Sequence, residues 1–298
     1  MTTTATASSV QIRPSRPHHL WFAGLSLLTI VACQGTLAAW LRLSLHSERY
    51  SHLWMIPLVS AYMILEIRKT VFGRLEWAPD GAVAMAIGVA CFGVGWVWPA
   101  LLGPVGDLTL KVLGVATVGG GLFRLCYGRQ AWRAAKFPVW FLLFAVPVPQ
   151  WVLDRAIEWL QVGSAAVVDA LLLLSQAPYV RSGLEFELAG LTIEIAPQCS
   201  GIRSSIALLI VAVLVAHYLL RRRTTKLLLV ALVIPLVLFK NGLRIATLSL
   251  LAVYVDPRFI TGSLHHKGGV VFFGLMLLVL GAWFWVLRKA EKGAERKK

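Results

Sequence analysis

The stretch Ile195-Ala196-Pro197-Gln198-Cys199-Ser200-Gly201-Ile202-Arg203-Ser204 joins an extended polar segment to a strongly apolar run. Cys199 lies at this boundary, where a thiol meets water on one side and an apolar substrate on the other. We expect a helix to begin at about Ser200 and to direct free backbone N–H groups at Cys199. Those donors and the partial positive charge of the helix end favour a thiolate. The alternative is that Ser200 is an ordinary helix N-cap and Cys199 a small buried side chain.

The composition indicates an integral membrane protein. Of the 298 residues, 58% are hydrophobic and 14% are charged, and the mean hydropathy is +0.73, which lies outside the range of soluble domains. The net charge of +15 raises the alternative of a nucleic-acid partner. The four cysteines form no CxxC pair and no metal-ligand spacing, and three of them lie in or beside apolar runs: Cys33, Cys91 and Cys126.

The apolar runs predict an all-α polytopic membrane protein with about eight transmembrane helices. A helix needs roughly 20 apolar residues to cross a bilayer. If both termini are cytoplasmic, most of the 29 lysines and arginines fall on the cytoplasmic side, which is the positive-inside pattern and makes a nucleic-acid partner unnecessary. The predicted spans are residues 21–41, 53–67, 81–101, 108–125, 137–148, 202–220, 227–255 and 269–287.

Three parts of the chain follow from this pattern. Residues 1–19 are rich in Thr, Ser and Arg and predict a disordered cytoplasmic tail. Residues 20–288 form one membrane-embedded domain, and residues 289–298 form a basic cytoplasmic tail. Within the domain, residues 152–175 predict a helix that lies along or dips into the outer face, because its acidic side chains make a lone span costly.

A period-two alternation precedes Cys199. Leu184-Glu185-Phe186-Glu187-Leu188 is followed by Ala189-Gly190 and then by Leu191-Thr192-Ile193-Glu194-Ile195. Alternating apolar residues around a glycine turn are typical of a β-hairpin. We therefore expect a small extracytoplasmic hairpin that leads the chain to Cys199.

The same topology brings three reactive residue types to the non-cytoplasmic face. Cys199 follows the hairpin, and His265 lies in the loop before the last span. At a rise of roughly 1.5 Å per residue, Arg244 lies about 25 Å along the seventh span, near the outer surface. Simpler interpretations stay open: Arg244 extends to lipid headgroups beside a hydrated Lys240 and Asn241, and His265 is an ordinary loop histidine.

Three sequence blocks in this order resemble the exosortase/archaeosortase family. They are Cys199-Ser200-Gly201-Ile202-Arg203-Ser204, Asn241-Gly242-Leu243-Arg244-Ile245, and His265 with Gly269-Val270-Val271-Phe272-Phe273-Gly274. The resemblance also takes in Phe137-Pro138 to Pro147-Val148-Pro149 and the hairpin, and it covers roughly residues 51–287.

This resemblance implies a multi-pass transpeptidase with its active site on the extracytoplasmic face of a bacterial inner or plasma membrane. Its substrates would be membrane-anchored proteins with a carboxy-terminal sorting signal, made of a Pro-Glu-Pro-like motif, a span and a basic cluster. By position, it implies Cys199 as the nucleophile, Arg244 as a fixed cation and His265 as the acid and base.

Two further residues stay open as site residues. His266 is adjacent to His265 and is the alternate catalytic histidine. Arg203 lies about one helical turn after Cys199, where it is suited to act as a second cation or to bind an acidic residue of the substrate. We expect no cofactor and no metal, because the chain has no HExxH motif and Cys199 with two histidines would be an unusual zinc ligand set.

A non-enzymatic function is the rival hypothesis. In a scaffold or transporter for surface polysaccharide, the polar residues of the seventh span would line a water-filled path. The lipid bilayer is a partner in both cases.

Overall fold

The structure is a computed structural model that describes residues 16–261 and 263–296. It contains two compact units, Met1–Trp151 and Val152–Lys298. Among the described residues the fold is helical apart from one small sheet, as the sequence predicts. The division into a tail, one membrane-embedded domain over 20–288 and a second tail stays a prediction.

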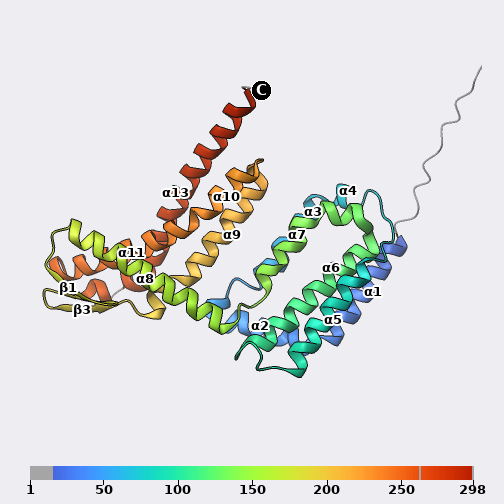
Figure 1. The fold of residues 1–298 in the computed structure, drawn as a ribbon, viewed down its shortest axis with the longest axis horizontal. Helices are drawn as coiled ribbons and strands as arrows, with labels where there is room; N and C mark the ends of the chain where they lie inside the picture. Colours follow the sequence, from blue (N-terminus) through green and yellow to red (C-terminus); the bar gives the residue numbers. More distant parts are fainter. Residues whose placement is uncertain (1–15, 262, 297–298) are drawn as a thin grey trace, which may run out of the picture. The chain divides into compact units, whose positions relative to one another are not determined.

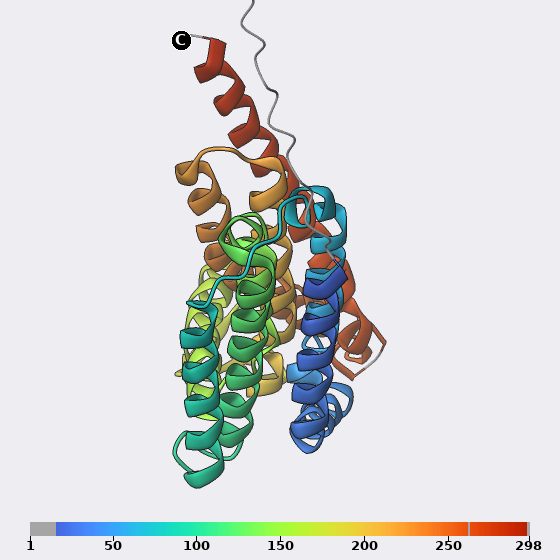
Figure 2. The same ribbon diagram turned by 90° about the vertical axis from the view of Figure 1, so that its right-hand side faces the viewer.

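The first unit is built from helices alone within its described part (Figure 1). Within it, α5 and α6 lie side by side in both ribbon views (Figures 1 and 2). The elements are α1 (Arg16–Ala32), α2 (Gln34–His46), η1 (Glu48–Tyr50), α3 (Met55–Glu66), α4 (Arg68–Val71), α5 (Gly81–Val97), α6 (Gly106–Ala134), α7 (Lys136–Phe141) and η2 (Leu142–Ala145).

Glycines let α5 and α6 approach each other closely. A Cβ built on Gly88 would lie 2.7 Å from the carbonyl oxygen of Gly114, and one built on Gly114 would lie 2.6 Å from that of Gly88. Gly81 and Gly121 repeat the arrangement two turns away, at 2.6 and 2.8 Å. Small residues at helix contacts are typical of membrane proteins, because close approach increases van der Waals packing.

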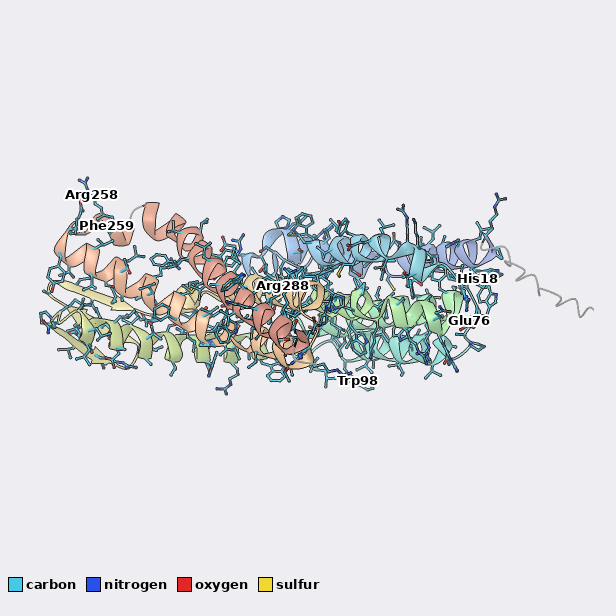
Figure 3. All side chains as sticks on the ribbon, turned by 90° about the horizontal axis from the view of Figure 1, so that it is seen from above. His18, Glu76, Trp98, Arg258, Phe259 and Arg288 are labelled. Carbon is cyan, nitrogen blue, oxygen red and sulfur yellow. The ribbon has the colours of Figure 1, made fainter. Side chains whose placement is uncertain are left out.

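The first helix begins earlier than the sequence indicated. Residues 1–15 of the predicted tail lie outside the described residues, but α1 starts at Arg16. His18 is buried; its Nδ1 donates to the carbonyl oxygen of Cys126 at 2.7 Å, and its ring stacks on Trp77. In Figure 3, His18 and Glu76 lie at the same end of this unit. These tertiary contacts stabilise a first turn that composition alone would leave unfolded.

The second unit combines helices with a three-stranded sheet. β1 pairs antiparallel with β2, and β2 pairs antiparallel with β3. Its elements are α8 (Gln150–Leu174), β1 (Tyr179–Ser182), β2 (Glu185–Leu188), β3 (Leu191–Glu194), η3 (Pro197–Ser200), α9 (Ile202–Leu219), α10 (Arg223–Ala231), α11 (Val233–Tyr254), α12 (Arg258–Thr261) and α13 (Ser263–Arg296). α8 begins two residues before the boundary of the unit.

The predicted hairpin is confirmed. Leu188 pairs with Leu191 across the turn, and Gly190 in that turn has a φ of +76°. The sequence did not indicate β1, whose alternation is weak. Contacts with α8 hold β1: the Tyr179 hydroxyl donates to the carboxylate of Asp169 at 2.7 Å, which raises the pKa of Tyr179, and Arg181 pairs with the same carboxylate at 3.0 Å.

The helix that the sequence predicts along or dipping into the outer face corresponds to α8. It has 25 residues and is long and apolar enough to cross a membrane. The acidic side chains that argued against a span have partners, because Asp169 pairs with Arg181 and Glu158 pairs with Arg155 at 3.0 Å. Pairing lowers the cost of placing such charges near lipid.

The protein is a multi-pass membrane protein. Within the described ranges, five helices are long and apolar enough to span a bilayer, or six if α1 and α2, which meet at a 74° bend, form one broken span. Other predicted spans are short: α3 has 12 residues, or about 18 Å of helix, against a hydrocarbon core of about 30 Å. The count of eight and the orientation of the termini stay predictions.

Candidate functional site

The segment that contains Cys199 is held by the core of the second unit. Ile195 ends the hairpin and is fully buried, in a cluster that includes Phe186 of β2 and Val168 of α8. The side-chain amide of Gln161 on α8 donates to the carbonyl oxygen of Ile195. Ile245 of α11 packs on the same cluster. The sheet is therefore fixed between α8 and α11, and it delivers the chain to a defined point beside α11.

A tight turn follows the sheet. Pro197–Ser200 form the 3₁₀ turn η3, and Gly201 adopts a left-handed conformation with φ +72° before α9 begins at Ile202. The helix thus begins two residues later than expected, and Gly201 rather than Ser200 holds the N-cap position. Ser200 is fully buried, and its hydroxyl has no hydrogen-bond partner within the described part of the chain. The idea that Ser200 is an ordinary N-cap is wrong.

Gly201 packs against two polar side chains of α11. A Cβ built on Gly201 would lie 3.1 Å from Lys240 Nζ and 3.1 Å from Asn241 Oδ1. Lys240 donates a hydrogen bond to Ser204 Oγ in the first turn of α9. The hydroxyls of Ser204 and Ser205 in turn donate to the Gly201 carbonyl oxygen at 2.9 and 2.8 Å. The turn after Cys199 is therefore tied directly to α11.

The same stretch of α11 is fixed against α8. Asn241 is fully buried, and its Nδ2 donates to Ser164 Oγ at 3.0 Å. At the next residue, a Cβ on Gly242 would lie 2.5 Å from Val167 Cγ1 and 3.1 Å from the Ser164 carbonyl oxygen. A buried hydrogen bond and a close backbone approach together set the rotation of α11 about its axis. The direction of the residues that follow, including Arg244, depends on this crossing.

The structure describes the side chains of some predicted site residues and only the backbone of others. Arg244 lies in α11 one turn after Lys240 and is partly buried, and Arg203 lies in the first turn of α9 and is exposed. The backbone of Cys199 lies in η3, and that of His265 in the first turn of α13. The side chains of Cys199, His265 and His266 lie outside the described part of the structure.

Backbone connections place the start of α13 at the end of α11 that packs on the sheet. α11 packs against β3 and against α13, and the short α12 joins the last turn of α11 to the first turn of α13. The hairpin cluster includes Leu250 and Val253 near the end of α11. The sheet, the end of α11 and the start of α13 therefore share one end of the second unit.

Sequence reasoning missed the contacts of Lys240 and Asn241. It treated them as a hydrated helix end or as the lining of a water-filled path, yet 4% of Lys240 and none of Asn241 is exposed. The signal was present as two polar residues inside an apolar run, one turn before Arg244. Neighbouring helices supply their partners, and a sequence does not name those partners.

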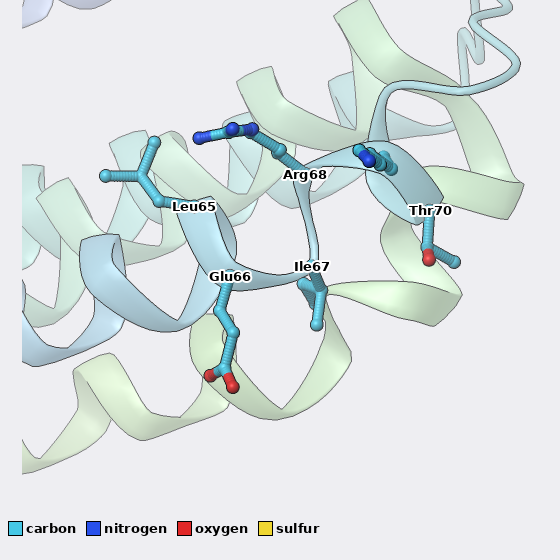
Figure 4. Close-up of a pocket in the computed structure, with 6 residues that line it drawn as sticks. Leu65, Glu66, Ile67, Arg68 and Thr70 are labelled. Atoms are coloured by element: carbon cyan, nitrogen blue, oxygen red, sulfur yellow. The ribbon is translucent and has the colours of Figure 1, made fainter.

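One surface hollow of the first unit offers no second candidate site. A surface hollow in the first unit is lined by residues 65–70 between α3 and α4. Figure 4 shows that Leu65 and Arg68 point to one side of the chain there, and Glu66 and Ile67 to the other, so these side chains do not converge on a ligand. Within residues 16–261 and 263–296, no group of three metal-binding side chains was found.

A family model described as transmembrane exosortase matches residues 40–282. The chain belongs to the exosortase family. The match runs from α2 to α13, so both units of this exosortase chain contribute to it. Comparison with curated proteins and with solved structures found no match.

Proposed function

We propose that this exosortase-family protein is a membrane cysteine transpeptidase. It cleaves the carboxy-terminal sorting signals of exported, membrane-anchored proteins and transfers the proteins to a surface acceptor. The observation that carries the proposal is the contact of the Gly201 turn, two residues after Cys199, with the segment of α11 that leads to Arg244. Two sequence blocks about 40 residues apart thereby meet at one place, as a shared active site requires.

The Cys199 thiolate attacks the carbonyl carbon of the scissile peptide bond, just outside the membrane. The carbonyl oxygen becomes a tetrahedral oxyanion, and Arg244, which does not lose its proton, stabilises it. When the C–N bond breaks, His265 gives a proton to the leaving amine and a thioester remains on Cys199. His265 then takes a proton from the incoming nucleophile, which displaces the thiolate.

The acceptor decides the outcome of the second step. An amine or hydroxyl of a lipid or polymer gives transpeptidation, and water gives proteolysis. Exposed Arg203 lies at the start of α9, where it is suited to bind an acidic residue of the sorting signal. In this proposal the site faces the extracytoplasmic side of a bacterial inner or plasma membrane.

The test is co-expression with an exported protein that carries a Pro-Glu-Pro-like motif, a span and a basic cluster. Cys199→Ala abolishes removal of the substrate's tail. Arg244→Lys retains about 1% of the activity or less, because a point charge does not reproduce the planar guanidinium fork. Arg155→Lys is the matched control, since Arg155 is exposed on α8, and it leaves activity unchanged.

The same assay distinguishes the two histidines and the rival function. His265→Ala abolishes tail removal and His266→Ala does not; the opposite pattern would move the acid and base role to His266. If tail removal persists in Cys199→Ala, the thiol mechanism is wrong. If no tail is removed by the wild type while surface polysaccharide depends on the protein, the scaffold or transporter function is favoured.

A further inference from the structure

Lys240 is a buried cation without a counter-ion in the described part of the protein. Only 4% of it is exposed, and its ammonium group donates a hydrogen bond to a neutral hydroxyl, that of Ser204. No ion pair with an acidic residue involves it within the described ranges. A buried ammonium group that lacks a counter-ion is strongly destabilising.

The surroundings of Lys240 add positive charge. Arg244 lies four residues further along α11, so the two cations are neighbours on the helix and repel each other. α9, which has 18 residues, begins at Ile202 beside Lys240 and presents the positive end of its dipole there. The turn that carries Cys199 therefore lies in a positive field that an anion would compensate.

The position of the ammonium group is defined by contacts. Ser204 accepts from Lys240 and donates to the Gly201 carbonyl oxygen at 2.9 Å, so one chain of hydrogen bonds joins the cation to the turn. A Cβ at Gly201 would lie only 3.1 Å from Nζ, and the glycine keeps this approach open. The cation lies against the backbone two residues from Cys199.

We propose that Lys240 is a positioning residue that stabilises the thiolate form of Cys199 through its charge. This inference rests on the proposed function, because it takes Cys199 as the nucleophile. Lys240 does not transfer a proton and does not touch the scissile bond. It lowers the cost of removing the thiol proton, so that more of the nucleophile is ionised at neutral pH.

Other charged groups lie on the elements that pack around this turn. They are Asp154, Glu158 and Asp169 on α8, Glu194 on β3, Arg203 on α9, Arg244 on α11, and His265 and His266 on α13. Asp169 and Glu158 are paired with Arg181 and Arg155, and Glu194 is exposed. The histidines titrate near neutral pH, so the effect of Lys240 is measured between variants that keep both of them.

The test is the rate at which iodoacetamide alkylates Cys199 as a function of pH. Full-length protein in detergent carries Cys33→Ser, Cys91→Ser and Cys126→Ala, so that one thiol remains. Lys240→Met keeps the length of the side chain and removes the charge. We expect it to raise the apparent pKa of the thiol by about 1 unit and to slow alkylation about tenfold at pH 7.

Three variants separate charge from structure. Lys240→Arg keeps the charge and retains the profile of the parent protein. Ser204→Ala keeps the charge but releases the ammonium group from the turn, so it shifts the profile in the same direction by less. Lys226→Met removes a lysine from α10, on the other side of the break at Leu232, and leaves the profile unchanged.

An alkylation profile of Lys240→Met that superimposes on the parent profile, in protein that elutes and melts like the parent, would overturn the inference. If Lys240→Met does not fold, Lys240→Arg gives the decisive result. An alkylation profile of Lys240→Arg that is shifted from the parent profile as far as that of Ser204→Ala would then overturn the inference. The proposed function has a separate readout, because tail removal that survives Cys199→Ala ends the nucleophile assignment whatever the alkylation profile shows.

Discussion

The two units use glycine for different purposes. In the first unit, Gly88 and Gly114 make room for each other's backbone, and the result is a close helix pair. In the second unit, Gly201 makes room for the ammonium group of Lys240 and the amide of Asn241. Close packing of backbone on backbone stabilises a fold, whereas a buried cation without a counter-ion has a stability cost. Under the proposed function, the first unit supports the fold and the second carries the chemistry.

The largest effect on stability is expected at the helix pair of the first unit. Gly88→Ala places a methyl group 2.7 Å from backbone atoms of α6, so α5 and α6 must separate at a cost of about 1–3 kcal/mol. Thermal unfolding in detergent measures this loss. Gly93→Ala on the same helix is the control, because its methyl group meets nothing within 4 Å. Equal melting temperatures for the two variants would contradict the packing account.

The next effect separates function from stability. Gly201→Ala strains a backbone with φ +72° and costs about 1–2 kcal/mol. Its methyl group also displaces Lys240 and Asn241, so we expect tail removal to fall by about 100-fold, a loss typical of a displaced active-site group. Gly190→Ala has φ +76° but open space around it. Gly190→Ala should therefore lose similar stability and keep its activity. If both variants lost the same activity, backbone strain alone would explain the loss, and the contact of Gly201 with Lys240 and Asn241 would not matter for activity.

A smaller loss is expected at the crossing of α8 and α11. Ser164→Ala removes the acceptor of the buried Asn241 hydrogen bond and costs about 1 kcal/mol. Activity should fall as well, because the bond helps to set the rotation of α11. Ser249→Ala is the control, because its buried hydroxyl donates to the Ile245 carbonyl oxygen of its own helix. If Ser249→Ala lowers activity more than Ser164→Ala, the crossing does not position the site.

Much of this architecture was predictable from sequence. The hairpin followed from alternation around Gly190, because a period of two has one structural meaning. The sequence predicts the beginning of α9 two residues too early, because serine is a common N-cap residue. The packing of Gly201 on α11 determines where the helix begins. The partners of Lys240 and Asn241 are 36 and 77 residues away. Contacts at that separation depend on tertiary packing, which local sequence does not encode.

The smallest effect concerns surface charge in the first unit. The Asp80 carboxylate accepts hydrogen bonds from Arg124 at 2.6 and 3.0 Å and from Arg129 at 3.0 Å. These bonds lower the pKa of Asp80 from 3.8 to about 2, and Arg124 has the larger effect. A depressed carboxyl pKa stabilises the fold above pH 3.8, and this stabilisation is lost as the pH falls through about 2.

The measurement is the melting temperature between pH 5 and pH 2. Asp80→Asn should lower it at pH 5 and flatten its pH dependence, and activity per folded molecule should not change. Glu158→Gln, which removes an exposed pair on α8, should have almost no effect on stability. A loss of specific activity in Asp80→Asn would show that the first unit does more than support the fold.

The central claim is that Cys199 is the nucleophile of a site assembled in the second unit. The most direct test mixes purified protein with a sorting-signal peptide, stops the reaction in acid and measures the intact mass. We predict a mass increase equal to the acyl fragment, located on Cys199 and removed by hydroxylamine, as expected for a thioester. Undiminished cleavage by Cys199→Ala, with no adduct on the parent protein, would contradict the account.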